Sequence, residues 1–142
     1  MILSENGLNI LKSLEGCKLT AYPDQGGVWT IGYGSTSNVV EGMVIDQQEA
    51  DTRLLAKIAQ VVNCVNMGVK VLLTQNKFDA LVIFVYNIGD GAFHASTMLK
   101  LLNNGSYLAA SEEFPKWDHA AHKENPGLLK RRLIEQKLFV TL

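Results

Sequence analysis

The sequence predicts an α+β fold that is mostly helical, with a small β-hairpin lobe near the N-terminus. Residues 17–34 are rich in β-branched and aromatic residues around a turn-forming segment. From residue 46 onwards, apolar residues recur at helical spacing. The length of 142 residues is typical of one domain. We therefore expect a single domain, 1–142, with a β-containing lobe at about 15–60 and a helical lobe at about 61–142 that also includes the N-terminal helix.

Residues 4–14 are predicted to form the first helix. Ser4 is a favourable N-cap, and leucines recur at helical spacing after it. Gly16 ends the pattern, because glycine readily takes the left-handed conformation that often follows a helix. Glu15 is therefore expected at the helix C-terminus, where the macrodipole disfavours a negative charge. This position favours the protonated carboxylic acid unless a cation lies near.

A β-hairpin is predicted next. Its strands are residues 19–22 and 28–31, and the proline, aspartate and glycines of 23–27 favour a turn between them. Asp24 lies in this loop and Thr30 in the second strand. If the hairpin folds beside the first helix, these two side chains face the same cleft as the helix end.

Glycines flank Tyr33 at the end of the hairpin. A glycine in a strand often marks close approach by a ligand or another backbone, so Gly32 and Tyr33 are candidate substrate-binding residues. Residues 39–43 are predicted either to add a third short strand or to be irregular.

The rest of the chain is expected to be helical. The helix predicted at 75–88 has an apolar centre on all sides, which is typical of a buried core helix. Residues 118–127 are polar and lack periodicity, so we expect an exposed loop there. The predicted helices are 46–66, 75–88, 96–103, 106–113 and 128–139.

Composition and charge argue against several classes of function. A net charge of −1 gives no reason to expect nucleic-acid binding, and the apolar stretch 80–86 is too short for a membrane span. The N-terminus lacks the features of a secretion signal, so we expect synthesis in the cytoplasm without an export signal. Cys17 and Cys64 are too few for a disulfide framework and lack metal-binding spacing. Free, buried thiols are expected, with a bridge between them as an alternative if the geometry permits.

Glu15, Asp24 and Thr30 form a plausible set for breaking a glycosidic bond. In such reactions one carboxylic acid protonates the leaving oxygen, and a second carboxylate acts as base or nucleophile. A threonine hydroxyl beside the second carboxylate can hold the attacking water. From the residues alone, an alternative to catalysis is that Glu15 and Asp24 are simply two charged side chains exposed to water.

Further short motifs accompany this set in a fixed order along nearly the whole chain. They are Glu15-Gly16, Leu19-Thr20-Ala21-Tyr22, Asp24, Gly27, Thr30-Ile31-Gly32-Tyr33-Gly34, Asn87-Ile88-Gly89-Asp90-Gly91-Ala92-Phe93, Ser96-Thr97-Met98-Leu99, Leu102-Asn103, Gly127-Leu128, Arg131-Arg132 and Glu135. Together they resemble the phage-type lysozymes, or endolysins, of glycoside hydrolase family 24. The resemblance implies a lysozyme-like fold with an active-site cleft between two lobes.

The resemblance also implies roles for individual residues. Glu15 would be the general acid on the glycosidic oxygen, and Asp24 with Thr30 would position the nucleophilic water of an inverting reaction. The bond cleaved would be the β-1,4 link between N-acetylmuramic acid and N-acetylglucosamine. Asn87 matches an amide that lines the cleft, although helix capping is an alternative role. No metal or cofactor is implied.

The implied partner is bacterial peptidoglycan, bound by a monomer with no nucleic-acid partner and no stable membrane insertion. A phage or prophage origin is implied, with lysis of the cell wall once the membrane has been permeabilised. One alternative is a catalytically silent peptidoglycan- or partner-binding protein on the same fold. Another is a related enzyme that acts on a polymer such as chitin, or an effector aimed at rival bacteria.

Two arginines near the C-terminus leave a structural question open. Arg131 and Arg132 are adjacent on a predicted helix, so we do not expect both of them to face the cleft. One is expected to pair with Glu15, and the other with solvent or Glu135. Trp117 is expected to pack between elements rather than to stack on a sugar.

Overall fold

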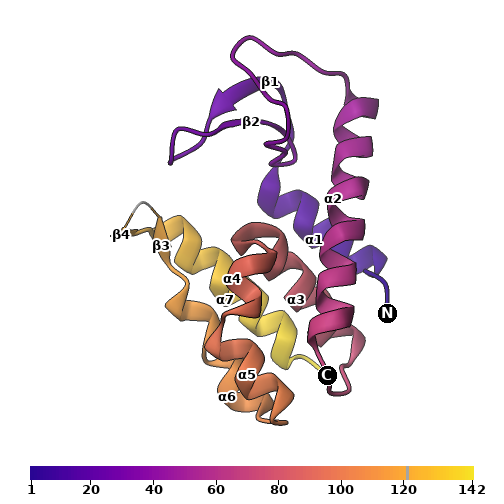
Figure 1. Ribbon diagram of the computed structural model, residues 1–142, viewed down its shortest axis with the longest axis vertical. Helices are drawn as coiled ribbons and strands as arrows, with labels where there is room; N and C mark the ends of the chain where they lie inside the picture. The colour runs from indigo at the N-terminus through magenta and orange to yellow at the C-terminus, as the bar shows by residue number, and fades with distance from the viewer. Residues whose placement is uncertain (121) are drawn as a thin grey trace.

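The chain folds as a helix and a β-hairpin followed by a series of helices (Figure 1). The computed structural model describes residues 1–120 and 122–142. The mostly helical α+β architecture predicted from the sequence is confirmed. The elements are α1 (Glu5–Glu15), β1 (Lys18–Pro23), β2 (Trp29–Gly32), α2 (Gln47–Gly68), α3 (Gln75–Ile88), α4 (Asp90–His94), α5 (Thr97–Asn103), α6 (Tyr107–Ser111), a 3-10 turn η1 (Phe114–Lys116), β3 (His119–Ala120), β4 (Lys123–Glu124) and α7 (Pro126–Val140).

Helix α1 begins and ends as its sequence predicts. The Ser4 hydroxyl accepts a hydrogen bond from the amide of Gly7 at 3.0 Å, which caps the first turn. The buried Asp79 of α3 accepts a hydrogen bond from the backbone amide of Ser4 at 3.1 Å and so anchors the start of the helix. Gly16 has a φ of +64° and ends the helix, which leaves Glu15 as its last residue.

The hairpin is a two-stranded antiparallel sheet. Tyr22 pairs with Thr30, and a bulge interrupts the register between Lys18 and Tyr22. After β2 the chain is irregular, with two isolated bridges, Ile31 to Ser35 and Thr20 to Val44, and residues 39–43 form no third strand. Helix α2 then runs from the hairpin side of the molecule to the helical lobe (Figure 1).

Helix α3 is the centre of the core. Every residue from 78 to 86 is buried, which confirms the expectation for a helix that is apolar on all sides. Helices α1, α2 and α7 pack around it. Trp117 packs edge-on against Phe84 of α3 at 5.7 Å between ring centroids, as expected.

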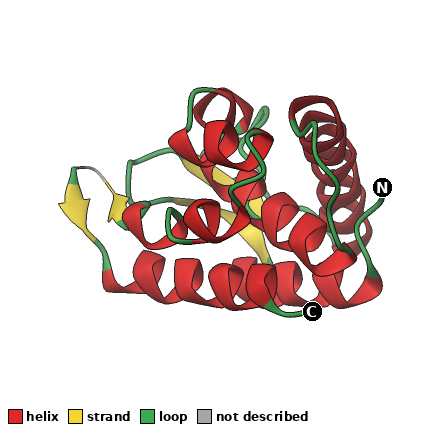
Figure 2. Ribbon diagram, turned by 90° about the horizontal axis from the view of Figure 1, so that it is seen from below, coloured by secondary structure: helices red, strands yellow, loops and turns green. Residues whose placement is uncertain are grey.

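The segment 118–127 was predicted to be an exposed loop. Its described residues, 118–120 and 122–127, are exposed or half-buried as expected, but they include two short strands, so the loop assignment is wrong there. Residue 121 lies outside the described residues. Strands β3 and β4 pair there, with His119 opposite Glu124 (Figure 2). Helix α7 also starts earlier than predicted, because Pro126 suits the first helical position and Asn125 caps it through the amide of Leu128. Two-residue strands are too short to produce a visible sequence period.

Smaller differences concern helix ends and the cysteines. Gly89, with a φ of +92°, is the single residue between α3 and α4, and α4 is a helical turn that begins at Asp90. Cys64 is buried as expected, whereas Cys17 is half-buried.

None of the described helices is both long and apolar enough to cross a membrane.

Candidate active site

A cavity of about 470 Å³ opens between the hairpin and the helical lobe. Glu15, Asp24 and Thr30 all line it, so the structure brings the predicted catalytic set together. A larger cavity of about 870 Å³ adjoins it and shares Asp24, Asn87 and Ile88 with it. The two adjoining cavities are together called the cleft below.

Glu15 is held by a cation from the far end of the chain. Nη1 of Arg131 donates a hydrogen bond to Oε1 of Glu15 at 2.7 Å, and the Glu15 side chain is only 13% exposed. Arg131 is thus the cation that the sequence left unassigned, and its charge opposes the unfavourable field at the end of α1. Space for the carboxylate depends on Gly34, since a Cβ at that residue would lie 3.1 Å from Oε2 of Glu15.

Asp24 shapes its own loop. Its Oδ1 atom accepts hydrogen bonds from the amides of Gly26 at 2.9 Å and Val28 at 2.8 Å. Within the described residues, its Oδ2 atom has no protein hydrogen-bond donor. Because the side chain is exposed at the cleft, this oxygen is available to a water or a substrate hydroxyl.

The Thr30 hydroxyl is oriented by its neighbour. It donates to the carbonyl oxygen of Val28 at 2.9 Å, and the residue is only 4% exposed. Since its single hydrogen is engaged, the hydroxyl oxygen faces any further polar group as an acceptor.

The remaining predicted site residues differ in their placement. Asn87 lines both cavities, and its Oδ1 accepts a hydrogen bond from Nη2 of Arg132, so its side chain does not cap a helix. Gly32 packs against α2, where an added Cβ would lie 3.5 Å from Ala50. The Tyr33 hydroxyl accepts a hydrogen bond from Gln47 at 3.2 Å. Neither Gly32 nor Tyr33 lines the described cavities, and their role in substrate binding stays a prediction.

Behind Glu15 lies a buried charge cluster on α7. Glu135 is 1% exposed and accepts hydrogen bonds from Arg131 at 3.2 Å and from Arg132 at 2.5 Å. Arg132 also donates to the carbonyl oxygen of Trp117 at 2.9 Å, so it is paired inside the protein rather than with solvent. Burial raises the pKa of Glu135, while the two arginines oppose that shift. Both arginines line the larger cavity, so the prediction that only one of them faces the cleft is wrong. Both guanidinium groups bond the same Glu135 carboxylate, which brings the two neighbouring side chains to one side of α7.

The sequence reading missed Lys57, a half-buried residue of α2 that lines the smaller cavity. Burial lowers the pKa of its ammonium group; Glu15 opposes this shift, and Arg131 adds to it. One signal was available: Lys57 follows Leu54 by three residues and precedes Val61 by four, so it lies on the buried face of the helix. Lysine is uncommon on the buried face of a helix, so its presence there indicates a specific role.

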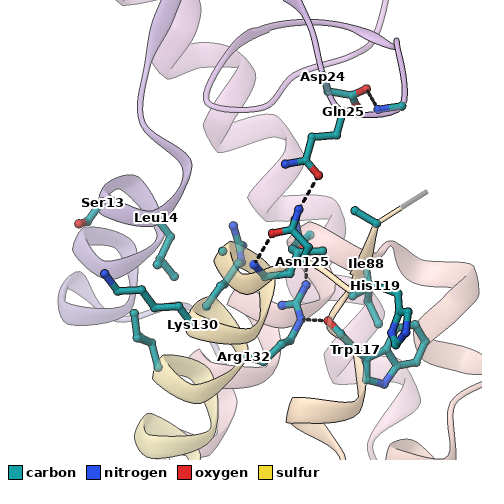
Figure 3. Close-up of a pocket in the computed structure, with 17 residues that line it drawn as sticks. Ser13, Leu14, Asp24, Gln25, Ile88, Trp117, His119, Asn125, Lys130 and Arg132 are labelled. Carbon is teal, nitrogen blue, oxygen red and sulfur yellow. Dashed lines mark hydrogen bonds between the residues drawn. The ribbon is translucent and has the colours of Figure 1, made fainter. Parts of the chain in front are cut away.

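A hydrogen bond also crosses the cleft between residues a hundred positions apart. Nδ2 of Asn125 donates to Oε1 of Gln25 at 2.7 Å, which joins the hairpin loop to the start of α7 (Figure 3). Both residues line the larger cavity. No sequence signal indicates this pairing, because neither residue has a distinctive local pattern. Among the described residues, no group of three or more histidine, cysteine or acidic side chains is arranged to hold a metal ion.

Known proteins of one family resemble this chain over most of its length. Residues 12–135 match the family described as phage lysozyme. The chain is 48% identical over 143 residues to an endolysin of Acyrthosiphon pisum secondary endosymbiont phage 1, covering 98% of each protein. It is 43% identical over 143 residues to the endolysin of Bacillus phage PZA, with 98% of this chain and 55% of that longer protein covered.

Among solved structures, the chain is similar to the muramidase domain of SpmX from Asticaccaulis excentricus. The TM-score is 0.88 at 35% identity, over 99% of this chain and 98% of that one. The fold and the family match define a lysozyme-type glycoside hydrolase. Within that class, the chain belongs to the phage lysozyme family.

Proposed function

We propose that this chain hydrolyses the β-1,4 bond between N-acetylmuramic acid and N-acetylglucosamine in bacterial peptidoglycan. The observation that carries the proposal is the meeting of Glu15, Asp24 and Thr30 on the wall of one cavity. Membership of the phage lysozyme family supports peptidoglycan as the polymer. Its endolysin relatives support a phage or prophage source and action at the cell wall.

Glu15 is the general acid in this proposal. It delivers a proton to the glycosidic oxygen as the bond between that oxygen and the anomeric carbon breaks. The carboxylate that remains is stabilised by the hydrogen bond from Arg131.

Asp24 and Thr30 hold the nucleophile. The free Oδ2 of Asp24 and the hydroxyl oxygen of Thr30 each accept one hydrogen of a water molecule. The water lone pair is then left to form the new bond to the anomeric carbon, and its departing proton goes to Asp24. This single displacement inverts the configuration at that carbon.

The substitution Glu15→Gln tests the acid. Glutamine has nearly the same shape, and its amide oxygen still accepts from Arg131, so the protein is expected to fold. Because the amide cannot donate a proton to the leaving group, release of reducing ends from purified peptidoglycan should fall by about 100-fold or more. Mass analysis of the released fragments identifies the bond and distinguishes hydrolysis from transglycosylation.

Glu41→Gln is the matched control, since Glu41 is exposed and lies outside both cavities. It should hydrolyse peptidoglycan at the normal rate. The proposal fails if Glu15→Gln also clears peptidoglycan normally. It fails as well if the unaltered chain binds insoluble peptidoglycan but releases no reducing ends, which is the behaviour of a silent binding protein.

A further inference from the structure

Lys57 places a positive charge on the wall of the proposed catalytic cavity. It comes from α2, and its ammonium nitrogen lies 4.0 Å from the ring centroid of Tyr86. Tyr86 lines the same cavity and is 3% exposed. Its hydroxyl donates to the carbonyl oxygen of Tyr33 at 2.5 Å, which fixes the ring under the lysine. The lysine side chain is thus ordered before any ligand arrives.

The ammonium group lacks a carboxylate partner. Within residues 1–120 and 122–142, none lies within 4.0 Å of it, and no hydrogen bond from it is found. The acidic residues that share the cavity have other partners. Glu15 is bonded to Arg131, and Asp90 accepts from Gln60 at 3.4 Å. Burial lowers the pKa of the ammonium group, and Glu15 and Asp90, which attract it from further away, oppose that shift. With no carboxylate within 4.0 Å among the described residues, this half-buried cation is still available to a carboxylate of a ligand.

The proposed substrate offers such an anion on alternate sugars. N-acetylmuramic acid carries a lactyl ether whose carboxyl is either free or extended by a peptide that bears carboxylates of its own. N-acetylglucosamine carries none. Among the described residues that line this cavity, Lys57 is the only one with a cationic side chain. It is therefore the counter-ion that this cavity, as distinct from the larger one beside it, offers to a carboxylate on that branch.

We propose that Lys57 binds a carboxylate on the N-acetylmuramic acid branch and so selects this polymer over neutral amino-sugar polymers such as chitin. The inference rests on the proposed function above and adds a specificity-determining residue to it. The ring of Tyr86 supports the lysine stem and reduces the ordering needed on binding.

The test removes the charge from the enzyme and from the substrate separately. Lys57→Met keeps the aliphatic stem that packs on Tyr86 and removes the ammonium. The substrates are peptide-bearing glycan strands and peptide-free glycan strands, each with free carboxylates or with the carboxyls converted to neutral methylamides. The measurement is kcat/KM from the release of reducing ends.

On free carboxylates, Lys57→Met should be about tenfold less efficient than the unaltered protein, as expected for loss of one charged hydrogen bond. Conversion of the carboxyls to methylamides should lower kcat/KM of the unaltered protein by a similar factor. It should change kcat/KM of Lys57→Met by less than about twofold. Lys57→Arg should recover part of the loss. The strand type on which the effect appears tells the lactyl carboxylate from a peptide carboxylate, and either location supports the inference.

Lys100→Met is the control, because Lys100 is exposed on α5 and lines neither cavity. It should respond to methylamide conversion as the unaltered protein does. If Lys57→Met folds poorly, Lys57→Gln and Lys57→Arg are compared on the same four substrates. The inference is overturned if methylamide conversion of the substrate lowers kcat/KM of Lys57→Met, or of Lys57→Gln, by the same factor as it lowers kcat/KM of the unaltered protein. Failure of the proposed function is distinct, because the unaltered protein would then release no reducing ends from any substrate.

Discussion

The two walls of the cleft hold their acidic residues by different means. On the hairpin wall, Asp24 is exposed and bonds amides within four residues of itself. On the helical wall, Glu15 is largely buried, and its partner Arg131 lies 116 residues further along the chain. Arg131 is itself bonded to Glu135, which is almost wholly buried.

Because of this difference, a substitution can affect activity alone on the hairpin wall, whereas on the helical wall it can also affect the stability of the fold. A carboxylate that bonds nearby amides can be changed to an amide with little effect on the fold, because the acceptor oxygen remains. A buried set of charges is different, since removing one member leaves the others desolvated without compensation. The hairpin wall should therefore tolerate substitutions that the helical wall does not.

Glu135→Ala should have the largest effect on stability. It leaves the buried guanidinium of Arg132 without its carboxylate, and the expected loss is about 3–5 kcal/mol of unfolding free energy, measured by urea denaturation. Glu49→Ala is the comparison, because its pair with Arg53 is 48% exposed on the glutamate side and should contribute about 1 kcal/mol or less. Equal losses in the two variants would contradict the claim that the buried charge cluster behind Glu15 contributes more to stability than an exposed ion pair does.

Asp24→Asn should affect chemistry and spare the fold. The asparagine oxygen still accepts from Gly26 and Val28, so the unfolding free energy should change by less than about 0.5 kcal/mol. Turnover of peptidoglycan should nevertheless fall by about 100-fold, because the amide cannot take the proton of water. Asp24→Ala should lose activity and also loosen the loop. An Asp24→Asn protein as active as the unaltered one would remove Asp24 from the mechanism.

Gln25→Ala should have the smallest effect. Its hydrogen bond to Asn125 joins the two walls but is exposed to water, so we expect a loss of at most about 1 kcal/mol in urea denaturation. Asn125→Asp removes the same donor and keeps the oxygen that caps α7. The two variants should therefore lose similar amounts of unfolding free energy. A much larger loss in either would show that the contact across the cleft contributes to global stability.

Local signals were enough to predict the catalytic set. Glu15 was placed at a helix end by Ser4 and Gly16, which cap and end a helix wherever they occur in this pattern. Asp24 and Thr30 were placed by turn chemistry and β-branched residues over a short stretch. Motifs in a known order then extended this prediction from a pair of carboxylates to a family.

The partners of those residues could not be predicted in the same way. Arg131 and Arg132 were recognised as candidates, but which of them meets Glu15 depends on how α7 packs against α3. Strands β3 and β4 could not be predicted, because two residues are too few to show the alternation of apolar and polar residues that is typical of a strand. The hydrogen bond between Gln25 and Asn125 joins two polar residues with no distinctive local signal.

The sequence by itself thus determined most of the helices, the first hairpin and the choice of Glu15, Asp24 and Thr30 as the proposed reacting groups. Capping, turn formation and apolar period are properties of neighbouring residues, so they can be read without the fold. Only the tertiary structure decided the electrostatic surroundings of those groups. Glu15 meets Arg131, and Lys57 enters the cavity above Tyr86, through the packing of α2, α3 and α7 around one core. Burial and distance set the strength of charges, and both arise when distant segments are brought together.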